Sequence, residues 1–151
     1  MMIPKNYILY LDDIRNPRDS FERMKEGIYL RNDWVVVRNY FSFCLTITGQ
    51  WEIKNFPSLI SFDHDLGKEH SDYFFENGGH ENPPDPMKAN FTEKTGYDCA
   101  KWLVDFCMDM NIALPKFKCH SHNPVGKENI LGLLTNFSTQ QTFKLSNFLF
   151  F

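Results

Sequence analysis

The segment YILYLDD, Tyr7–Asp13, is a short apolar run that ends in two acidic residues. Such a run is typical of a buried β-strand whose C-terminal end carries charge. Three further segments have strand-like character, and the sequence predicts strands at Trp34–Arg38, Leu59–Phe62 and Phe117–Ser121. Together these four strands would form the sheet of a small domain.

Predicted helices separate these strands. They show a polar stretch after a loop, apolar residues at helical spacing, or a capping residue at the start. The predicted helices are one or two turns within Asp19–Glu26, a short helix at Tyr40–Thr48 ended by Gly49, a helix from the N-cap Thr95 to near Asn111, and Val125–Phe137 after Pro124. Strands that alternate with helices predict an α/β fold, a three-layer sandwich with a mostly parallel sheet.

Two segments fall outside this alternation. Residues 66–93 are rich in Gly, Pro, Asn and acidic residues, and we expect a long irregular flap beside the site, or else a disordered insertion without function. We expect the apolar C-terminal tail, residues 142–151, to form an edge strand or an exposed patch that needs a partner, such as a second copy in a homodimer. The 151 residues are expected to form one domain, residues 1–151.

The composition argues against several classes of function. Sixteen Lys and Arg against nineteen Asp and Glu give a net charge of −3, which argues against generic DNA binding. Cys44, Cys99, Cys107 and Cys119 lack disulfide-like or CxxC spacing, so we expect reduced thiols in the core. We find no signal peptide and no apolar run near the roughly 18 residues of a membrane span. We therefore expect a cytoplasmic protein without membrane contact.

Acidic residues follow two of the predicted strands. The first strand ends in Asp12 and Asp13, and the third ends in Asp63, His64 and Asp65. In an open parallel sheet the carboxyl ends of the strands meet at one rim, where ligands bind. Carboxylates held close together repel each other, and a divalent cation relieves that repulsion. The sequence therefore predicts a site for Mg²⁺ or Mn²⁺ among the four carboxylates of Asp12, Asp13, Asp63 and Asp65.

Two histidines follow the fourth predicted strand. In extended backbone His120 and His122 share one face, with Ser121 opposite. Two imidazoles about 7 Å apart suit a general base and a general acid on a scissile phosphate, or two metal ligands. Asp63 and Asp65 likewise share a face, so Asp65 is either a further ligand of the cation or, with the two histidines, a candidate catalytic residue.

An anion site is predicted directly after the histidines. The segment from Asn123 to Lys127 leads into a helix N-terminus, where free N–H groups and the helix dipole favour a phosphate. Gly126 permits close approach and Lys127 adds a positive charge, while arginines after other strand ends can clamp further phosphate oxygens. The candidate phosphate-binding residues are Lys127, Gly126, Ser121, Asn123, Arg15 and Arg38.

Each motif also has a purely structural interpretation. The acidic pairs are also typical of turns or helix caps, and His120 and His122 could be a structural pair of surface histidines. We expect His70 and His80, in the 66–93 segment, to be solvent-exposed, and Trp102 and Phe106 to belong to the core. The convergence of three strand ends on one rim favours the functional interpretation.

Four motifs, in this order, resemble the cyclic-phosphate-processing receiver domain family, which is derived from response-regulator receivers. They are LDDIRNP (Leu11–Pro17), ISFDHDLG (Ile60–Gly67), TGYDCAKWL (Thr95–Leu103) and HSHNPVGKENI (His120–Ile130). The resemblance spans roughly residues 7–134. It implies a receiver or flavodoxin-like sheet of four strands in the order 2-1-3-4, or of five strands if the tail adds one.

The resemblance also implies roles for the rim residues. Asp12, Asp13 and Asp63 match the acidic metal pocket of receivers, and Asp65, His120 and His122 match the residues that distinguish the derived family. Phosphorelay signalling is disfavoured, because the candidate lysine for it, Lys144, lacks the usual following Pro.

The implied function is a metal-dependent phosphoesterase that acts on a small cyclic nucleotide or on a 2′,3′-cyclic phosphate at an RNA end. Two alternatives stay open. One is a non-catalytic sponge that sequesters a cyclic nucleotide, and the other is a degenerate receiver that serves as a protein-interaction module.

Overall fold

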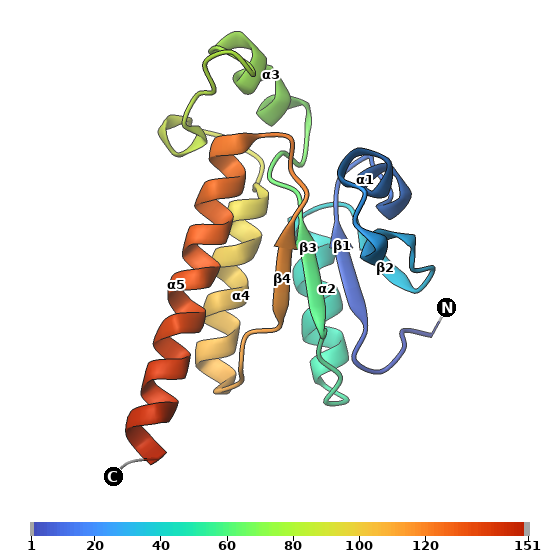
Figure 1. Ribbon diagram of the computed structural model, residues 1–151, viewed down its shortest axis with the longest axis vertical. Coiled ribbons are helices and arrows are strands. Elements are labelled where there is room, and N and C mark those ends of the chain that lie inside the picture. The colour runs from blue at the N-terminus through green and yellow to red at the C-terminus, as the bar shows by residue number, and fades with distance from the viewer. Residues whose placement is uncertain (1, 150–151) are drawn as a thin grey trace.

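The computed structural model describes residues 2–149, with side chains through residue 144. Its centre is a sheet of four parallel strands in the order β2-β1-β3-β4 (Figure 1). The strands are β1 (Ile8–Leu11), β2 (Trp34–Val37), β3 (Leu59–Phe62) and β4 (Lys116–Cys119). The predicted strand order is confirmed, and within the described residues the sheet has no fifth strand.

Helices connect successive strands, and one more helix follows β4. They are α1 (Pro17–Met24), the 3-10 helix η1 (Gly27–Leu30), α2 (Tyr40–Trp51), α3 (Lys68–Glu76), the 3-10 helix η2 (Pro86–Lys88), α4 (Gly96–Met110) and α5 (Pro124–Leu149). The parallel pairing requires these crossovers, because a tight hairpin can join only antiparallel strands. The predicted N-cap of α4 is confirmed: the Thr95 side chain accepts from Asp98 N–H, and the Asp98 carboxylate accepts from Thr95 N–H.

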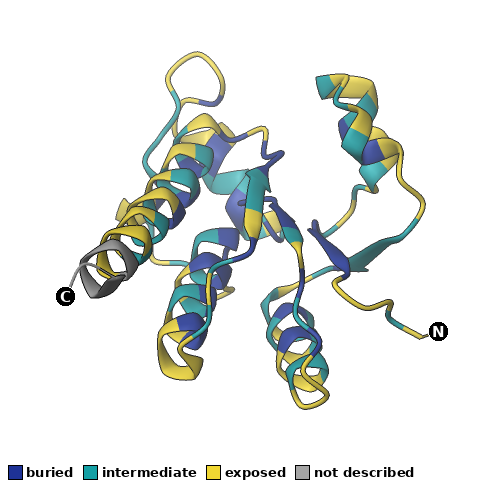
Figure 2. Cartoon of the chain, turned by 60° about the horizontal axis from the view of Figure 1, so that its bottom comes forward, coloured by how far each residue is buried: buried dark blue, intermediate teal, exposed yellow. Residues whose placement is uncertain are grey.

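One face of the sheet carries the apolar core. Successive strand residues point to opposite faces, so Leu9 and Leu11 share a face, where they join one buried cluster with Phe43 and Ile47 of α2 and Leu103 of α4. Helix α5 packs against α4 and the edge strand β4. The buried sides of the helices turn inward and their exposed sides face solvent (Figure 2).

The opposite face of the sheet is unusually polar. Tyr10 of β1 shares a 2.7 Å hydrogen bond with Ser20 of α1, and Ser61 of β3 shares one of 2.7 Å with Tyr29 of η1. All four side chains are buried. Helices α1 and η1 therefore cover this face, which gives the three-layer arrangement and a core held together by hydroxyl groups.

The 66–93 segment is not the structureless loop that we expected. It contains α3 and η2, and α3 lies beyond the carboxyl ends of the strands (Figure 1). His70, expected at the surface, is buried: its Nδ1 accepts from Leu66 N–H at 2.8 Å and its Nε2–H donates to the Glu93 carbonyl at 3.1 Å. His80 is exposed as expected.

The C-terminal tail is helical rather than a strand. Helix α5 was expected to end at Phe137 but continues to Leu149, so the tail from Thr142 extends it, and residues 150–151 lie outside the described residues. Two other helices also differ from their expected bounds. Helix α2 does not end at Gly49 but continues to Trp51, and α1 begins earlier, at Pro17, because proline suits a first turn.

The remaining structural expectations concern the cysteines, two aromatic residues and the membrane. All four cysteines are free thiols; three are buried and Cys44 is half-buried. Phe106 is part of the core, and the half-buried Trp102 stacks on it with ring centroids 5.1 Å apart. Among the described residues, no helix combines the length and the apolar character needed to cross a membrane.

Candidate functional site

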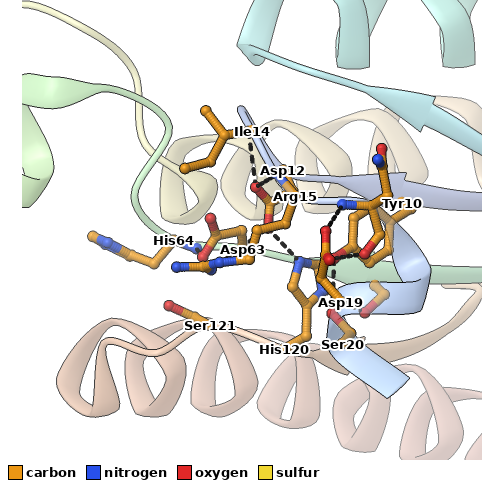
Figure 3. A network of polar contacts seen from close by, with 12 residues as sticks. Tyr10, Asp12, Ile14, Arg15, Asp19, Ser20, Asp63, His64, His120 and Ser121 are labelled. Atoms are coloured by element: carbon orange, nitrogen blue, oxygen red, sulfur yellow. Dashed lines mark hydrogen bonds and ion pairs between the residues drawn. The ribbon is translucent and has the colours of Figure 1, made fainter. Parts of the chain in front are cut away.

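The sheet register places three functional side chains in one row. Asp12, Asp63 and His120 each follow the last residue of β1, β3 and β4, respectively. The N–H groups of Asp63 and His120 donate to the neighbouring strand, both at 2.9 Å, so the row continues past the sheet. By strand alternation, the three residues point to the same face of the sheet as Tyr10 and Ser61, which pair with each other in the sheet. They therefore extend from the polar face (Figure 3).

Three carboxylates gather at this rim. Asp12, Asp13 and Asp63 each offer an oxygen within 4.8 Å of the others, and Asp12 and Asp63 are buried. Burial and the charge of Asp12 raise the pKa of Asp63 well above its usual range, and the same two causes raise the pKa of Asp13. The cluster therefore favours either protonation or a cation.

Asp12 remains the ionised member of the cluster. Burial acts to raise the pKa of Asp12, but hydrogen bonds from His120 and the backbone outweigh it and lower the pKa. Oδ1 accepts from the N–H groups of Ile14 at 3.0 Å and Arg15 at 2.7 Å, while Oδ2 lies 3.1 Å from His120 Nε2. Since Oδ1 is fully engaged, Asp12 presents one oxygen, Oδ2, to a ligand.

A chain of hydroxyl groups orients His120. Its Nδ1 lies 2.7 Å from Ser61 Oγ, which lies 2.7 Å from the hydroxyl of Tyr29. Because Asp12 can only accept, Nε2–H donates to it, Nδ1 accepts from Ser61, and Ser61 accepts from Tyr29. Tyr10 stacks on the imidazole with ring centroids 4.2 Å apart and an interplanar angle of 6°. The ring is thus fixed in both position and tautomer.

The two histidines of the HxH motif occupy different environments, contrary to the expected matched pair. His120 is 1% exposed, and burial lowers its pKa so that the ring is neutral. His122 is exposed and lines a cavity beside Asp13 and Asp63. Partial burial and the positive charge of Arg15 lower the pKa of His122 to about 4. Strand β4 ends at Cys119, so the extended alternation assumed for this segment does not hold.

The cavity beside the acids measures about 110 Å³. Besides the two acids and His122, the residues from the sheet side that line it are Ile14, Arg15, Asp65, Ser121 and Asn123, and those from the 66–93 segment are Ser71, Phe74, Phe75 and His80. Helix α3 and the turn that follows it therefore form one wall of the cavity.

Asp65, on the sheet side of the cavity, belongs to a separate set of contacts. His64 Nδ1–H donates to Asp65 Oδ1 at 2.7 Å, and the Asn123 amide donates to the same oxygen at 3.3 Å. Burial acts to raise the pKa of Asp65, but the His64 and Asn123 contacts outweigh it and lower that pKa. Asp65 is therefore a carboxylate at neutral pH.

The helix N-terminus expected to hold an anion is already capped. Asn123 Oδ1 accepts from Gly126 N–H at 3.0 Å, so this amide is not free. A Cβ on Gly126 would lie 2.4 Å from Cγ of His64, so the glycine permits close packing against this ring rather than the approach of a phosphate. The expectation of a free phosphate cradle is wrong for this residue.

The three basic candidates separate in space. Arg15 lines the cavity, with Nη1 3.7 Å from Asp12 Oδ2. Arg38 instead donates to the carbonyls of Asp12 and Arg15, at 3.1 and 2.6 Å, and holds the loop after β1. Lys127 lines a separate groove on α5 with Pro83 and Leu131. Only Arg15 therefore lines the acidic cavity.

Three supporting residues had no motif in the sequence. Tyr29 and Ser61 complete the hydroxyl chain, and Arg23 donates to the carbonyl of His120. Ser61 stands two residues before Asp63, so strand alternation could have placed its side chain on the same face as the acidic cluster. Nothing local marked Tyr29, because η1 is a single short turn.

These features define a class of protein. A parallel sheet in the order 2-1-3-4 with an acidic pocket beyond its carboxyl ends is a receiver-like, flavodoxin-type α/β domain. The family model described as the cyclic-phosphate processing receiver domain matches residues 7–136, so the chain belongs to that family. The resemblance drawn from the four motifs is thereby confirmed. Searches of curated proteins and of solved structures returned no match.

Proposed function

We propose that this protein is a divalent-cation-dependent phosphoesterase that opens a cyclic phosphate, either a small cyclic nucleotide or a 2′,3′-cyclic end. The observation that carries the proposal is the cluster of Asp12, Asp13 and Asp63 beside a cavity lined by His122. Membership of a cyclic-phosphate processing family supports the choice of substrate.

The acidic cluster fits a cation by its chemistry. Carboxylate oxygens are the ligands that Mg²⁺ and Mn²⁺ prefer. The raised pKa values of Asp63 and Asp13 indicate that negative charge on these carboxyl groups is not fully offset by nearby positive charge. When bound, such a cation would polarise a phosphoryl oxygen of the substrate. Asp12 would contribute its Oδ2 alone, because Oδ1 is held by two backbone N–H groups.

Proton transfer is assigned to His122. Its lowered pKa keeps the imidazole neutral at pH 7, so it can accept a proton from the attacking water. The water oxygen bonds to phosphorus as the bond to one ribose oxygen breaks, and His122 returns the proton to that ribose oxygen. The product is a phosphomonoester.

Neighbouring residues would support this step. Arg15 faces the same cavity and would offset the charge that develops on the phosphoryl oxygens. Asp65, a carboxylate on the cavity wall, would accept a hydrogen bond from the water and orient it. His120 is a positioning residue, because it contacts Asp12 and is buried beneath the rim.

The experiment measures hydrolysis of 2′,3′-cyclic nucleotides and of cyclic dinucleotides with Mg²⁺ or Mn²⁺. Turnover should disappear with EDTA, and in His122→Ala and Asp63→Asn, whereas the exposed and distant Asp109→Asn should match the wild type. No turnover of any of these substrates, or turnover indifferent to EDTA, would refute the proposal.

A second candidate function is sequestration without hydrolysis. The burial of His120 favours it, because only one histidine of the HxH motif then reaches the cavity. Calorimetry with a cyclic nucleotide, followed by recovery of the ligand, separates the two functions: intact ligand after tight binding indicates a sponge.

A further inference from the structure

The acidic cavity is too small for a whole nucleotide. Pockets that enclose drug-sized ligands measure roughly 300–1,000 Å³, whereas this cavity measures about 110 Å³. It has room for a phosphoryl group beside the carboxylates but none for a ribose and a base. Any nucleoside attached to that phosphoryl group must therefore extend across the mouth of the cavity.

One apolar and two aromatic side chains lie exposed at this mouth. Ile14 and Phe75 line the cavity yet are 74% and 64% exposed, so their free surfaces face outward at its edge. His80 is also exposed and lies edge-on to Phe75, with ring centroids 5.9 Å apart. Exposed aromatic groups of this size usually mark a contact surface when they gather in one place.

The wall that carries Phe75 is held firmly at its base. The neighbouring Phe74 is 3% exposed and lies edge-on to Phe75, with ring centroids 5.1 Å apart. At the start of α3, the Glu69 carboxylate accepts from the N–H groups of Thr92 at 2.8 Å and Glu93 at 3.1 Å. These contacts join the two ends of the 66–93 segment, so Phe75 is presented from an anchored element.

Other contacts in this segment exclude a competing interpretation. Glu69, His70 and Glu93 could form a metal-binding group by their spacing. Both ring nitrogens of His70 are already used, one by Leu66 N–H and the other by the Glu93 carbonyl. The hydrogen bonds of this cluster therefore secure the base of the wall, and His70 has no free ring nitrogen for a cation.

We propose that Phe75, with Ile14 and His80, forms a stacking site for the base of a nucleotide whose phosphate occupies the acidic cavity. This inference rests on the proposed function for the position of the phosphate, but it concerns binding rather than hydrolysis. A nucleobase is planar and has an apolar face, which suits the exposed face of an aromatic side chain. The substrate class is thus a nucleoside phosphate rather than a simple phosphate ester.

The test uses calorimetry with two probes that opening of a cyclic phosphate cannot consume. They are adenosine 3′-phosphate and inorganic phosphate, each with Mg²⁺ in excess. Phe75→Ala should bind adenosine 3′-phosphate about 10- to 100-fold more weakly, the range expected for the loss of one stacked base, and should bind phosphate unchanged. Phe75→Trp should retain the affinity for the nucleotide.

Phe143→Ala is the matched control, because Phe143 is 65% exposed and belongs to the C-terminal part of α5. That end of α5 is remote from α3 (Figure 1). It should leave both affinities unchanged. Equal binding of the nucleotide by Phe75→Ala and Phe143→Ala, parallel loss of both probes in Phe75→Ala, or no nucleotide binding by the wild type would overturn the inference. Selective loss in Phe75→Ala would uphold it even if the protein hydrolyses nothing, since that result would refute only the proposed function.

Discussion

His120 Nε2 lies 3.1 Å from Asp12 Oδ2, and both side chains are almost fully buried. This contact fixes Oδ2 of the carboxylate, while two backbone N–H groups fix Oδ1. A carboxylate held in this way keeps the same free lone pair whether or not a ligand is present. The histidine nearest the acids therefore acts through Asp12 rather than on the substrate.

Ser61→Ala should loosen this arrangement without removing any acid. Without the Ser61 hydroxyl, Nδ1 of His120 loses its donor, and the ring is no longer restricted to the tautomer that donates to Asp12. We expect about 3- to 30-fold weaker Mn²⁺ binding, measured by electron paramagnetic resonance, and a changed ¹⁵N chemical shift of His120. Ser20→Ala, which removes a buried hydroxyl bonded to Tyr10 instead, should change neither quantity. An unchanged His120 spectrum in Ser61→Ala would contradict the assignment of the hydroxyl chain as the group that orients His120.

Gly126→Ala and Gly132→Ala should have opposite effects on stability. Both residues lie in α5, but a Cβ at Gly126 would lie 2.4 Å from the buried ring of His64, whereas a Cβ at Gly132 would meet nothing within 4 Å. Overpacking should destabilise Gly126→Ala by about 1–3 kcal/mol. Helix propensity should stabilise Gly132→Ala by about 1 kcal/mol. Urea unfolding measures both, and equal effects would refute the packing assignment.

The sequence was informative where one rule acted alone. Short apolar runs predicted the strands well, and the rule that parallel strands end at one rim predicted that Asp12, Asp13 and Asp63 lie close together. These rules did not predict the burial of His120. That burial depends on η1, a single turn whose Tyr29 covers the polar face of the sheet. Helix α3 was missed because its cap, Gly67, forms no side-chain hydrogen bond, and because tertiary contacts of Glu69 and His70 secure its first turn.

His122 should titrate near pH 4, well below an ordinary histidine. Partial burial and the charges of Arg15 and Arg23 disfavour the imidazolium, so the ring is neutral above this pKa and gains a proton only as the pH falls through it. Arg15→Gln should raise the pKa toward the usual value of about 6.5. Proton NMR of the imidazole ring follows both titrations. A wild-type midpoint near 6.5 would show that these charges do not reach the ring.

Asp63→Asn should separate the cost of the acidic cluster from its use. In the metal-free protein, burial and Asp12 both oppose ionisation of Asp63, so replacing the carboxyl with a neutral amide should raise the melting temperature by about 3 °C. In the wild type, Mg²⁺ at 100 times its dissociation constant should stabilise the fold by about 2.7 kcal/mol, or about 5–10 °C. Asp63→Asn should lose most of that metal-dependent increase.

Scanning fluorimetry in EDTA and across a Mg²⁺ series measures both effects. Asp109→Asn, which neutralises an exposed carboxylate near the end of α4, should show the wild-type melting temperature and the wild-type response to Mg²⁺. An Asp63→Asn protein that still gains stability with Mg²⁺ as the wild type does would mean that the cation binds elsewhere. A lower melting temperature for Asp63→Asn in EDTA would mean that the buried carboxyl is already stabilised without a cation.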